Sequence, residues 1–215
     1  MLARNFQCSF LVTEDVAVSW VSAGPGGTIN KTIPAGTEYD TLEDWATYLT
    51  GLFASAWISF TFDEAGGSIT VVDPAGLAWT LTTGSSLLAA YLGLSTVEAH
   101  TGDYEGAVVP GWWSGYVKRD WGYSPVRSVA KIGAEYGTVR HGSPNVADDF
   151  ILWASFDTSV AWVQLYTFIS YAADGKTFTD NAGRKFIIGE QSEFSQALVA
   201  PPMMTQLALA AIQVP

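Results

Sequence analysis

Short runs in which apolar and polar residues alternate open the chain. Residues 6–13, 16–21 and 28–33 each show this period of two, which is typical of strands that bury one face. The glycines and proline of residues 23–27 predict a turn before the third run. We therefore expect antiparallel sheet from the start of the chain.

The period changes to that of a helix after residue 40. The apolar residues that recur at helical spacing are Leu42, Trp45, Leu49, Leu52 and Phe53. Asp40 can cap this helix, and Glu43 three residues later completes a capping box. The pattern predicts one amphipathic helix whose apolar face lies on the sheet.

Three further alternating runs follow this helix, at 57–62, 68–73 and 77–82. Turns that contain glycine join them. Ser85 or Ser86 then caps a short helix, which Gly93 ends in the left-handed conformation. The larger side chains of this helix are Leu87, Leu88, Tyr91 and Leu92. We expect them to fill the open end of the sheet, as packing rather than as a site.

The second half of the chain repeats this mixture of strands and one helix. Strands are expected at 125–132, within 133–142, at 150–156, in a hairpin over 176–189 with an Asn-Ala-Gly turn, and at 204–214. A helix is expected over 157–175, with Gly175 at its end. The residues expected on one face of this helix are Trp162, Leu165, Tyr166 and Ile169.

These elements predict an α+β fold that is mainly antiparallel β, with two sheet modules each covered by one amphipathic helix. The first module is expected over residues 1–95 and the second over 125–215. Residues 96–124 are rich in Gly and Trp and predict a long loop or linker. Its aromatic residues can pack either on their own protein or on a neighbouring subunit, and the sequence leaves both alternatives open.

The composition favours a subunit that buries part of its surface against neighbours. Of the 215 residues, 48% are hydrophobic, 13% are aromatic and only 14% are charged, whereas ordinary soluble proteins carry about 25% charged residues. Aromatic residues are enriched and charged residues depleted at the core of protein interfaces. A single β-rich domain with a large core is the alternative reading.

The charge of the chain argues against a general role in binding nucleic acid. The formal net charge is −11, and phosphate contacts require basic clusters. Five of the ten basic residues lie between positions 118 and 140, where they can face an acidic copy of the chain or form a solvated strand face. The candidate interface residues are Trp112, Trp113, Tyr116, Lys118, Arg119, Trp121, Tyr123 and Arg127.

No motif of catalysis, cofactor binding or metal binding stands out. His100 and His141 have no neighbouring Cys or second His at the spacing of a zinc site. Asp148 and Asp149 are adjacent and are expected to form a turn or a helix start. The nucleophile elbow, the phosphate loop and the dinucleotide fingerprint are absent. We therefore expect no catalytic residue, no cofactor and no metal ligand.

The single cysteine and the N-terminal residues add little chemistry. Cys8 has no partner for an internal disulfide and is expected to be a small buried hydrophobe. The first residues show no pattern of a signal peptide, and no run reaches the roughly 18 apolar residues of a membrane span. We expect no membrane association.

Two stretches resemble structural proteins of virus particles. Residues 28–95 contain "TIPAGTEYDTLEDWATYLTGLF" and then "WISFTFDEAGGSITVVDPAGLAWTLTTGSSLLAAYLGLS". The order of an Ile-Pro segment, a helix, strands, a serine-rich turn and a small apolar plug resembles a module of virion structural proteins. Residues 125–214, with "ADGKTFTDNAGRKF" between a helix and a final strand, look like sheet-plus-helix modules of tailed-phage tail and baseplate proteins.

The resemblance implies a non-enzymatic virion subunit that acts by symmetric self-association. A tail, baseplate or neck protein of a tailed phage is expected first, and a capsid decoration protein is the alternative within the same class. Its partners would be copies of itself and other virion proteins, and it would lie in the virion after assembly in the host cytoplasm. A glycan-binding module that uses Trp112 and Trp113 is the alternative outside that class, with an unrecognised hydrolase last.

Overall fold

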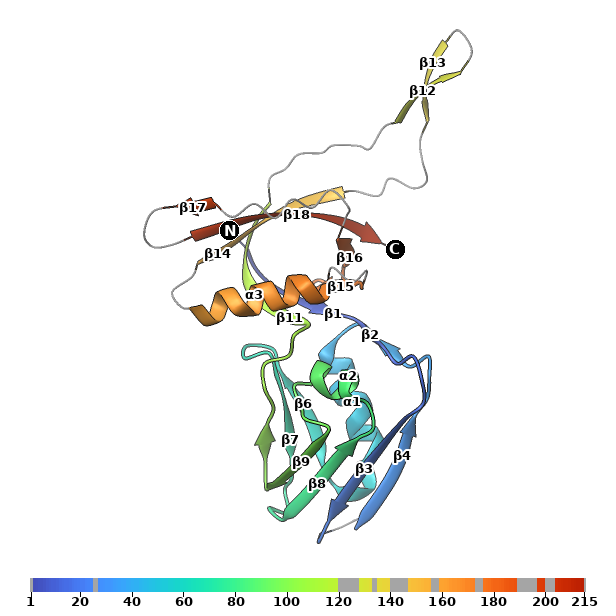
Figure 1. Ribbon diagram of the computed structural model, residues 1–215, viewed down its shortest axis with the longest axis vertical. Coiled ribbons are helices and arrows are strands. Elements are labelled where there is room, and N and C mark those ends of the chain that lie inside the picture. The colour runs from blue at the N-terminus through green and yellow to red at the C-terminus, as the bar shows by residue number, and fades with distance from the viewer. Residues whose placement is uncertain are drawn as a thin grey trace.

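Figure 1 shows the computed structural model of the chain. It describes residues 2–24, 27–119, 128–132, 135–139, 147–155, 159–172, 176–188, 197–199 and 204–214, with side chains at 5–24, 27–114, 163–172 and 176–187. The described residues form an α+β structure, and every strand pairing among them is antiparallel. The predicted fold class is therefore confirmed.

A seven-stranded sheet forms one part of the molecule, which we call the barrel module. Its order is β14 (Ala147–Ser155), β11 (Trp112–Arg119), β1 (Leu2–Cys8), β15 (Phe178–Asp180), β16 (Lys185–Ile188), β18 (Met204–Val214) and β17 (Ala197–Val199). β14 also pairs with β18, from Ala147↔Ile212 to Ser155↔Met204. Because the first and sixth strands of the order pair, the sheet closes on itself and β17 extends it at the side.

The last helix of the chain packs beside the barrel module. This helix, α3 (Ser159–Ala172), buries Leu165, Phe168, Ile169 and Ala172 in a cluster with residues of β1, β11, β15 and β16. Tyr166, which was expected on the same face, is 62% exposed, so that assignment was wrong. Asp148 and Asp149 lie within β14 rather than in a turn, opposite Ala211 and Ala210 of β18.

The remaining part, residues 9–111, is inserted between β1 and β11, and we call it the inserted module. One sheet has the order β4 (Thr28–Ile33), β3 (Val16–Ser22), β8 (Ala78–Thr83) and β9 (Val97–Thr101). A second has the order β10 (Tyr104–Glu105), β7 (Ser68–Val72) and β6 (Ser59–Asp63), and β2 (Phe10–Leu11) pairs with β5 (Glu38–Tyr39). Its helices are α1 (Leu42–Leu52), the 3-10 turn η1 (Ala54–Ala56) and α2 (Ser86–Tyr91).

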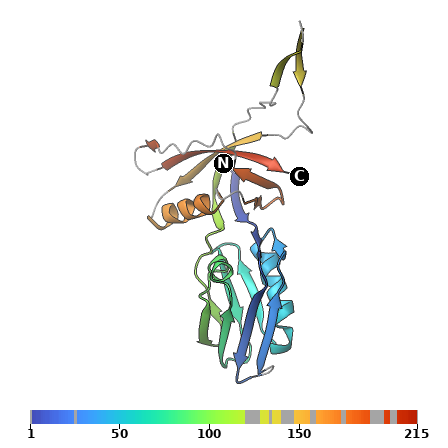
Figure 2. The ribbon, with the colours of Figure 1, turned by 45° about the vertical axis from the view of Figure 1, so that its right-hand side comes forward.

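The observed organisation corrects the predicted boundaries. Residues 2–8, expected in the first module, pair with β11 and β15 of the barrel module. Residues 97–105, expected in the linker, form β9 and β10 of the inserted module. The inserted module also contains two main sheets, where one was expected. The chain therefore crosses between the two modules twice, once on each side of the insertion (Figure 2).

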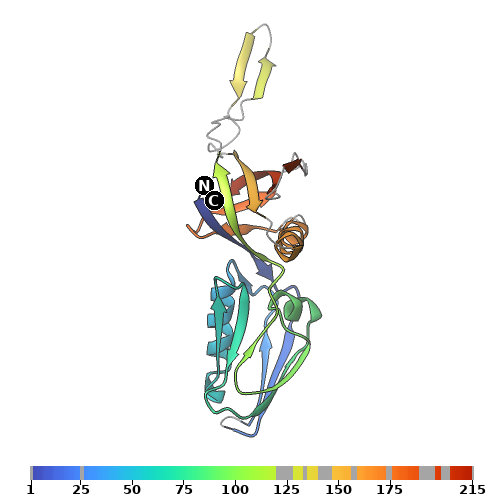
Figure 3. The same ribbon diagram turned by 90° about the vertical axis from the view of Figure 1, so that its left-hand side faces the viewer.

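A single hydroxyl joins α1 to the edge of the second sheet. Thr50 of α1 accepts a hydrogen bond from the Phe60 N–H at 2.8 Å and donates to the Ala46 carbonyl at 2.9 Å. β6 is an outer strand of its sheet, so α1 covers an edge that would otherwise expose unpaired backbone groups. Figure 3 shows α1 and α2 on opposite sides of the inserted module.

The helix caps differ from the sequence expectation in one case. α2 is capped by Ser85, whose hydroxyl accepts from the Leu88 N–H, and Gly93 has a φ of 70° after the helix, as predicted. α1 is capped by Thr41, not by Asp40, because the hydroxyl of Thr41 accepts from the Asp44 N–H. The carboxylate of Asp40 instead forms an ion pair with the ammonium of Lys185 in the barrel module, at an N–O distance of 2.6 Å.

The plug expected from the short helix is present with one exception. Leu88, Tyr91 and Leu92 are buried in the core of the inserted module, whereas Leu87 is 72% exposed. Leu87 lies about 100° around the helix from Leu88 and so falls outside the buried face. This exposed leucine instead lines a groove between the inserted module and the barrel module.

The two strands β12 (Ser128–Ile132) and β13 (Glu135–Val139) pair with each other. Within the described ranges they pair with no other strand, and Figure 1 draws them apart from both modules.

Candidate functional site

The two tryptophans proposed as interface anchors are buried within the chain itself. Trp112 is 4% exposed and belongs to the core of the inserted module, and Trp113 is 3% exposed and stacks on Phe6 with ring centroids 5.8 Å apart. The self-packing alternative therefore holds for both rings, and the sugar-stacking platform proposed for them is wrong. Of the other candidates, Tyr116, Lys118 and Arg119 lie in β11. The side chains of these three, and the whole of Trp121, Tyr123 and Arg127, lie outside the described residues.

An exposed tryptophan that the sequence analysis did not single out is Trp57, at the end of η1. Its side chain is 72% exposed, and its backbone has φ 59° and ψ 23°, the left-handed conformation. It is the one non-glycine residue with positive φ among the described residues. That conformation costs an L-residue roughly 1–2 kcal/mol. Trp57 is the C-cap of η1, where its N–H donates to the Ala54 carbonyl at 3.2 Å, and a left-handed residue is a common end of a helix. In the sequence, the position of Trp57 shortly after the end of an expected helix was the one sign that its ring could be exposed.

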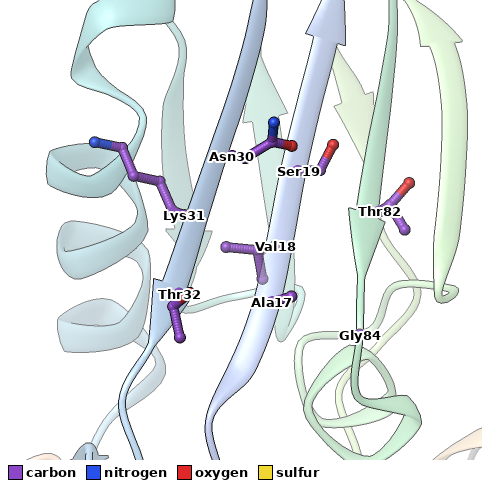
Figure 4. A pocket seen from close by; sticks show the side chains of 8 residues that line it. All are labelled: Ala17, Val18, Ser19, Asn30, Lys31, Thr32, Thr82 and Gly84. Atoms are coloured by element: carbon purple, nitrogen blue, oxygen red, sulfur yellow. The ribbon is translucent and has the colours of Figure 1, made fainter.

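The outer face of the four-stranded sheet is a second surface that no described helix or strand covers. Figure 4 shows part of it, with Ser19, Asn30 and Thr82 on three neighbouring strands. The register places twelve residues on this face: Ala17, Ser19, Val21, Thr28, Asn30, Thr32, Ala78, Thr80, Thr82, Val97, Ala99 and Thr101. None of these is charged, although the chain carries a net charge of −11. A shallow hollow of about 490 Å³ lies across β3, β4 and β8 on this face, and Lys31 of the outer strand β4, whose position in the register belongs to the other face, also lines it.

A groove of about 630 Å³ lies where the two modules meet, and we call it the junction groove. A column of stacked rings lines it: Phe10 on Tyr91 with centroids 4.7 Å apart, and Tyr91 on Tyr171 at 6.0 Å. Leu87 and Ala90 of α2 line one wall. The groove is therefore apolar at its floor.

Charged residues lie around the junction groove. Glu14 and Glu38 are among the residues that line it. Lys176 also lines the groove, and its ammonium sits over the Tyr171 ring, 3.6 Å from the centroid. Burial raises the pKa of the Tyr91 phenol well above its usual value, and its hydroxyl donates to the Cys8 carbonyl at 2.9 Å. The Tyr91 hydroxyl is thus a neutral donor that ties α2 to the end of β1.

Cys8 lies beneath the same junction and is free and buried. Burial raises the pKa of its thiol far above the usual value, and the nearby Lys176 lowers it by a smaller amount. A thiol held neutral in this way is a poor nucleophile. The expectation of a small buried hydrophobe at Cys8 is confirmed.

The one pairing of histidine with carboxylate in the described part of the chain joins His100 to Glu98. The Nε2 atom of His100 lies 2.7 Å from the Glu98 carboxylate, and its ring stacks on Tyr104 at 3.5 Å. Burial alone would raise the pKa of Glu98, but hydrogen bonds from His100 and Ser95 outweigh it and lower that pKa. Among the described residues, no side chain of serine, threonine or cysteine forms a hydrogen bond with His100. The pair therefore stabilises β9.

Metal ligands do not gather in the described ranges: no group of three or more His, Cys, Asp or Glu side chains lies close enough to hold an ion. Within those same ranges, no helix has the length and hydropathy that a membrane crossing requires.

Comparison with protein-family models, with curated proteins and with solved structures found no match to the chain. The function is therefore inferred from the residues themselves. The surfaces described above that can serve it are the exposed Trp57, the uncharged sheet face and the junction groove, and the outer side of α3 is a further one.

Proposed function

We propose that this protein is a non-enzymatic structural subunit that works by self-association. One observation carries the proposal: the outer face of the four-stranded sheet presents twelve residues without a charge in a chain of net charge −11. Exposed sheet surfaces of monomeric proteins usually carry charges, which oppose unwanted association.

The charge of the chain indicates what covers this face. Two copies repel each other because both are acidic, so a contact between them must use surface that lacks carboxylates. A basic partner would instead be attracted to the acidic parts of the molecule. A second copy of the chain is therefore the occupant that the charge distribution favours.

A second surface supports the same proposal. α3 contains no charged residue and exposes Val163 at 60% and Tyr166 at 62%, while its other face is buried on the barrel module. A helix that is apolar around most of its circumference is normally covered. Self-association would cover such a helix as well as the sheet face.

The resemblance in sequence supports the class of assembly. Together with the exposed uncharged surfaces it points to a virion subunit, first a tail, baseplate or neck protein of a tailed phage and second a capsid decoration protein. Copies of the chain and other virion proteins would be its partners, and the virion its location. A glycan-binding module is the rival function, for which Trp57 is the remaining exposed ring of a tryptophan in the described residues.

The test measures the mass of the wild-type protein in solution against concentration, by light scattering after gel filtration and by sedimentation. We expect oligomers that grow with concentration and that electron microscopy shows as rings or stacked assemblies. Thr82→Glu places a carboxylate on the uncharged face and should weaken association. Thr61→Glu, an exposed position on a strand of the other sheet, is the matched control and should leave association unchanged. A wild-type protein that stays monomeric at high concentration would refute self-association.

A further inference from the structure

The hairpin of β12 and β13 lies apart from the rest of the described chain. Its strands pair with each other from Ser128↔Val139 to Ile132↔Glu135, and within the described ranges they pair with no other strand. Figure 1, Figure 2 and Figure 3 all draw the hairpin away from both modules. A two-stranded hairpin by itself is marginally stable in water, and packing against a further surface stabilises it. The hairpin therefore needs a surface that the described part of its own copy does not offer.

The hairpin and the inserted module lie at opposite ends of β11. This strand begins at Trp112, where the inserted module ends, and it ends at Arg119, from which the chain leads on to β12. Its eight residues span about 26 Å. The barrel module lies between the hairpin and the inserted module in all three views (Figure 1, Figure 2 and Figure 3).

The sequence around the hairpin and the inserted module carry opposite charges. Residues 118–140 contain five basic and two acidic residues and so carry a net charge of +3. Lys118 and Arg119 of this set lie in β11, and Lys131 lies in β12. Residues 9–111 contain twelve acidic residues and one basic residue and so carry −11. Nine of those twelve acidic residues are exposed, so the inserted module presents an acidic surface.

From this arrangement we propose that the hairpin of β12 and β13 of one copy docks on the acidic inserted module of a second copy. The proposal rests on the proposed function, self-association, and names a contact between the copies. The hairpin and the inserted module are different surfaces, so the contact is head to tail, and it forms rings when it closes and filaments when it does not.

The charges favour a second copy as the partner of the hairpin. Acidic copies repel each other over most of their surface, and the basic segment is the part that attraction brings to a neighbour. DNA or RNA would also be attracted to the basic residues, but the carboxylates of the same molecule would repel its phosphates. The inserted module of a second copy instead supplies carboxylates as the complement of these bases.

Coupling of lysine amines to carboxylates by a carbodiimide tests the contact, because the bond forms only between groups that touch. Equal amounts of unlabelled and heavy-nitrogen-labelled wild-type protein are mixed, coupled and analysed by mass spectrometry, which separates bonds within a copy from bonds between copies. Lys185 and Asp40, with an N–O distance of 2.6 Å, are the control for a bond within one copy. We expect Lys131 of one copy to be joined to a carboxylate of residues 9–111 of the other.

A charge reversal measures how much the hairpin contributes to association. Lys131→Glu should weaken association about three- to tenfold relative to Lys131→Arg, which keeps the charge and is the matched control. Both proteins also carry Thr82→Glu, so that contact through the uncharged sheet face does not hide the difference. Sedimentation measures association, and the difference should shrink at about 0.5 M salt, where charges are screened within a few Å. Circular dichroism confirms that both variants are folded.

Three results would overturn the docking while leaving the proposed function in place, provided that wild type self-associates. In the first, Lys131 is coupled only within its own copy, only to the barrel module of a second copy, or to no carboxylate. In the second, Lys131→Glu and Lys131→Arg associate equally. In the third, wild type retains a DNA duplex, Lys131→Glu does not, and no bond forms between copies, which would assign the hairpin to nucleic acid. A wild-type protein that stays monomeric at every concentration refutes the proposed function and this contact with it.

Discussion

Replacing Gly67 by alanine tests how tightly the barrel module is joined to the inserted module. Gly67 lies in the turn between β6 and β7 with a φ of 71°, and a Cβ atom there would lie 2.1 Å from Cε3 of Trp112. Trp112 is the first residue of β11, the strand on which the chain returns to the barrel module. The glycine therefore allows the ring to lie directly on the turn.

Two costs add in this variant. The left-handed conformation costs an alanine roughly 1–2 kcal/mol. Displacing a buried ring from a packed core costs about 1–3 kcal/mol more. Gly76→Ala is the matched control, because Gly76 has a φ of 62° but no atom within 4 Å of the position that a Cβ would take. The free energy of unfolding should fall by about 2–5 kcal/mol for Gly67→Ala and by only the first amount for Gly76→Ala.

Urea unfolding followed by circular dichroism and by tryptophan fluorescence measures both variants. The comparison is valid where the slope against urea stays the same as in wild type. If the two glycine variants lose the same stability, Trp112 does not pack on the turn as described, and the close junction between the modules is refuted.

Three further predictions concern single groups. Trp57→Asn should raise the free energy of unfolding by up to about 1 kcal/mol, because it relieves the left-handed strain; a loss of stability would mean that the ring supports the fold. Tyr91→Phe removes the hydrogen bond to the buried Cys8 carbonyl and should cost about 1–2 kcal/mol in urea unfolding, and an unchanged midpoint would contradict that bond. Burial by itself would raise the pKa of Glu98, but hydrogen bonds from His100 and Ser95 outweigh it and lower that pKa. In the same way, hydrogen bonds from Arg184 and Ala182 lower the pKa of the buried Asp180. A lowered pKa stabilises the fold fully above the unfolded value, near 4, and this contribution is lost as the pH falls through the folded pKa values. Stability should thus decline below about pH 4, and Asp180→Asn should flatten the decline; an equally steep decline in that variant would contradict the assignment.

The positions of single strands and turns could be predicted from the sequence. The alternation over residues 28–33 predicts β4 with the observed bounds, and the final strand over 204–214 is β18. The turn at Asn181, Ala182 and Gly183 is also as predicted, with a φ of 73° at the glycine. These features depend on neighbours a few positions away, so a period or a turn residue is enough to identify them.

The assignment of side chains to surfaces was less certain, because a period does not say what lies opposite. Asp40 has the sequence environment of a helix cap, yet it pairs with Lys185, which is 145 positions later. Trp112 and Trp113 stand in a Gly-rich segment typical of loops, and both are buried by strands from elsewhere in the chain. Trp57 has no sequence signal for its left-handed backbone.

The sequence by itself determined the antiparallel α+β class, most strand positions and the low proportion of charged residues, 14%. The tertiary structure alone decided that β14 and β18 close the barrel module through pairs 49 to 65 positions apart, and that residues 9–111 are inserted between two of its strands. It also brought twelve uncharged residues of four strands onto one face. The physical reason is that register and closure depend on contacts between distant segments, whose free energies no local pattern contains.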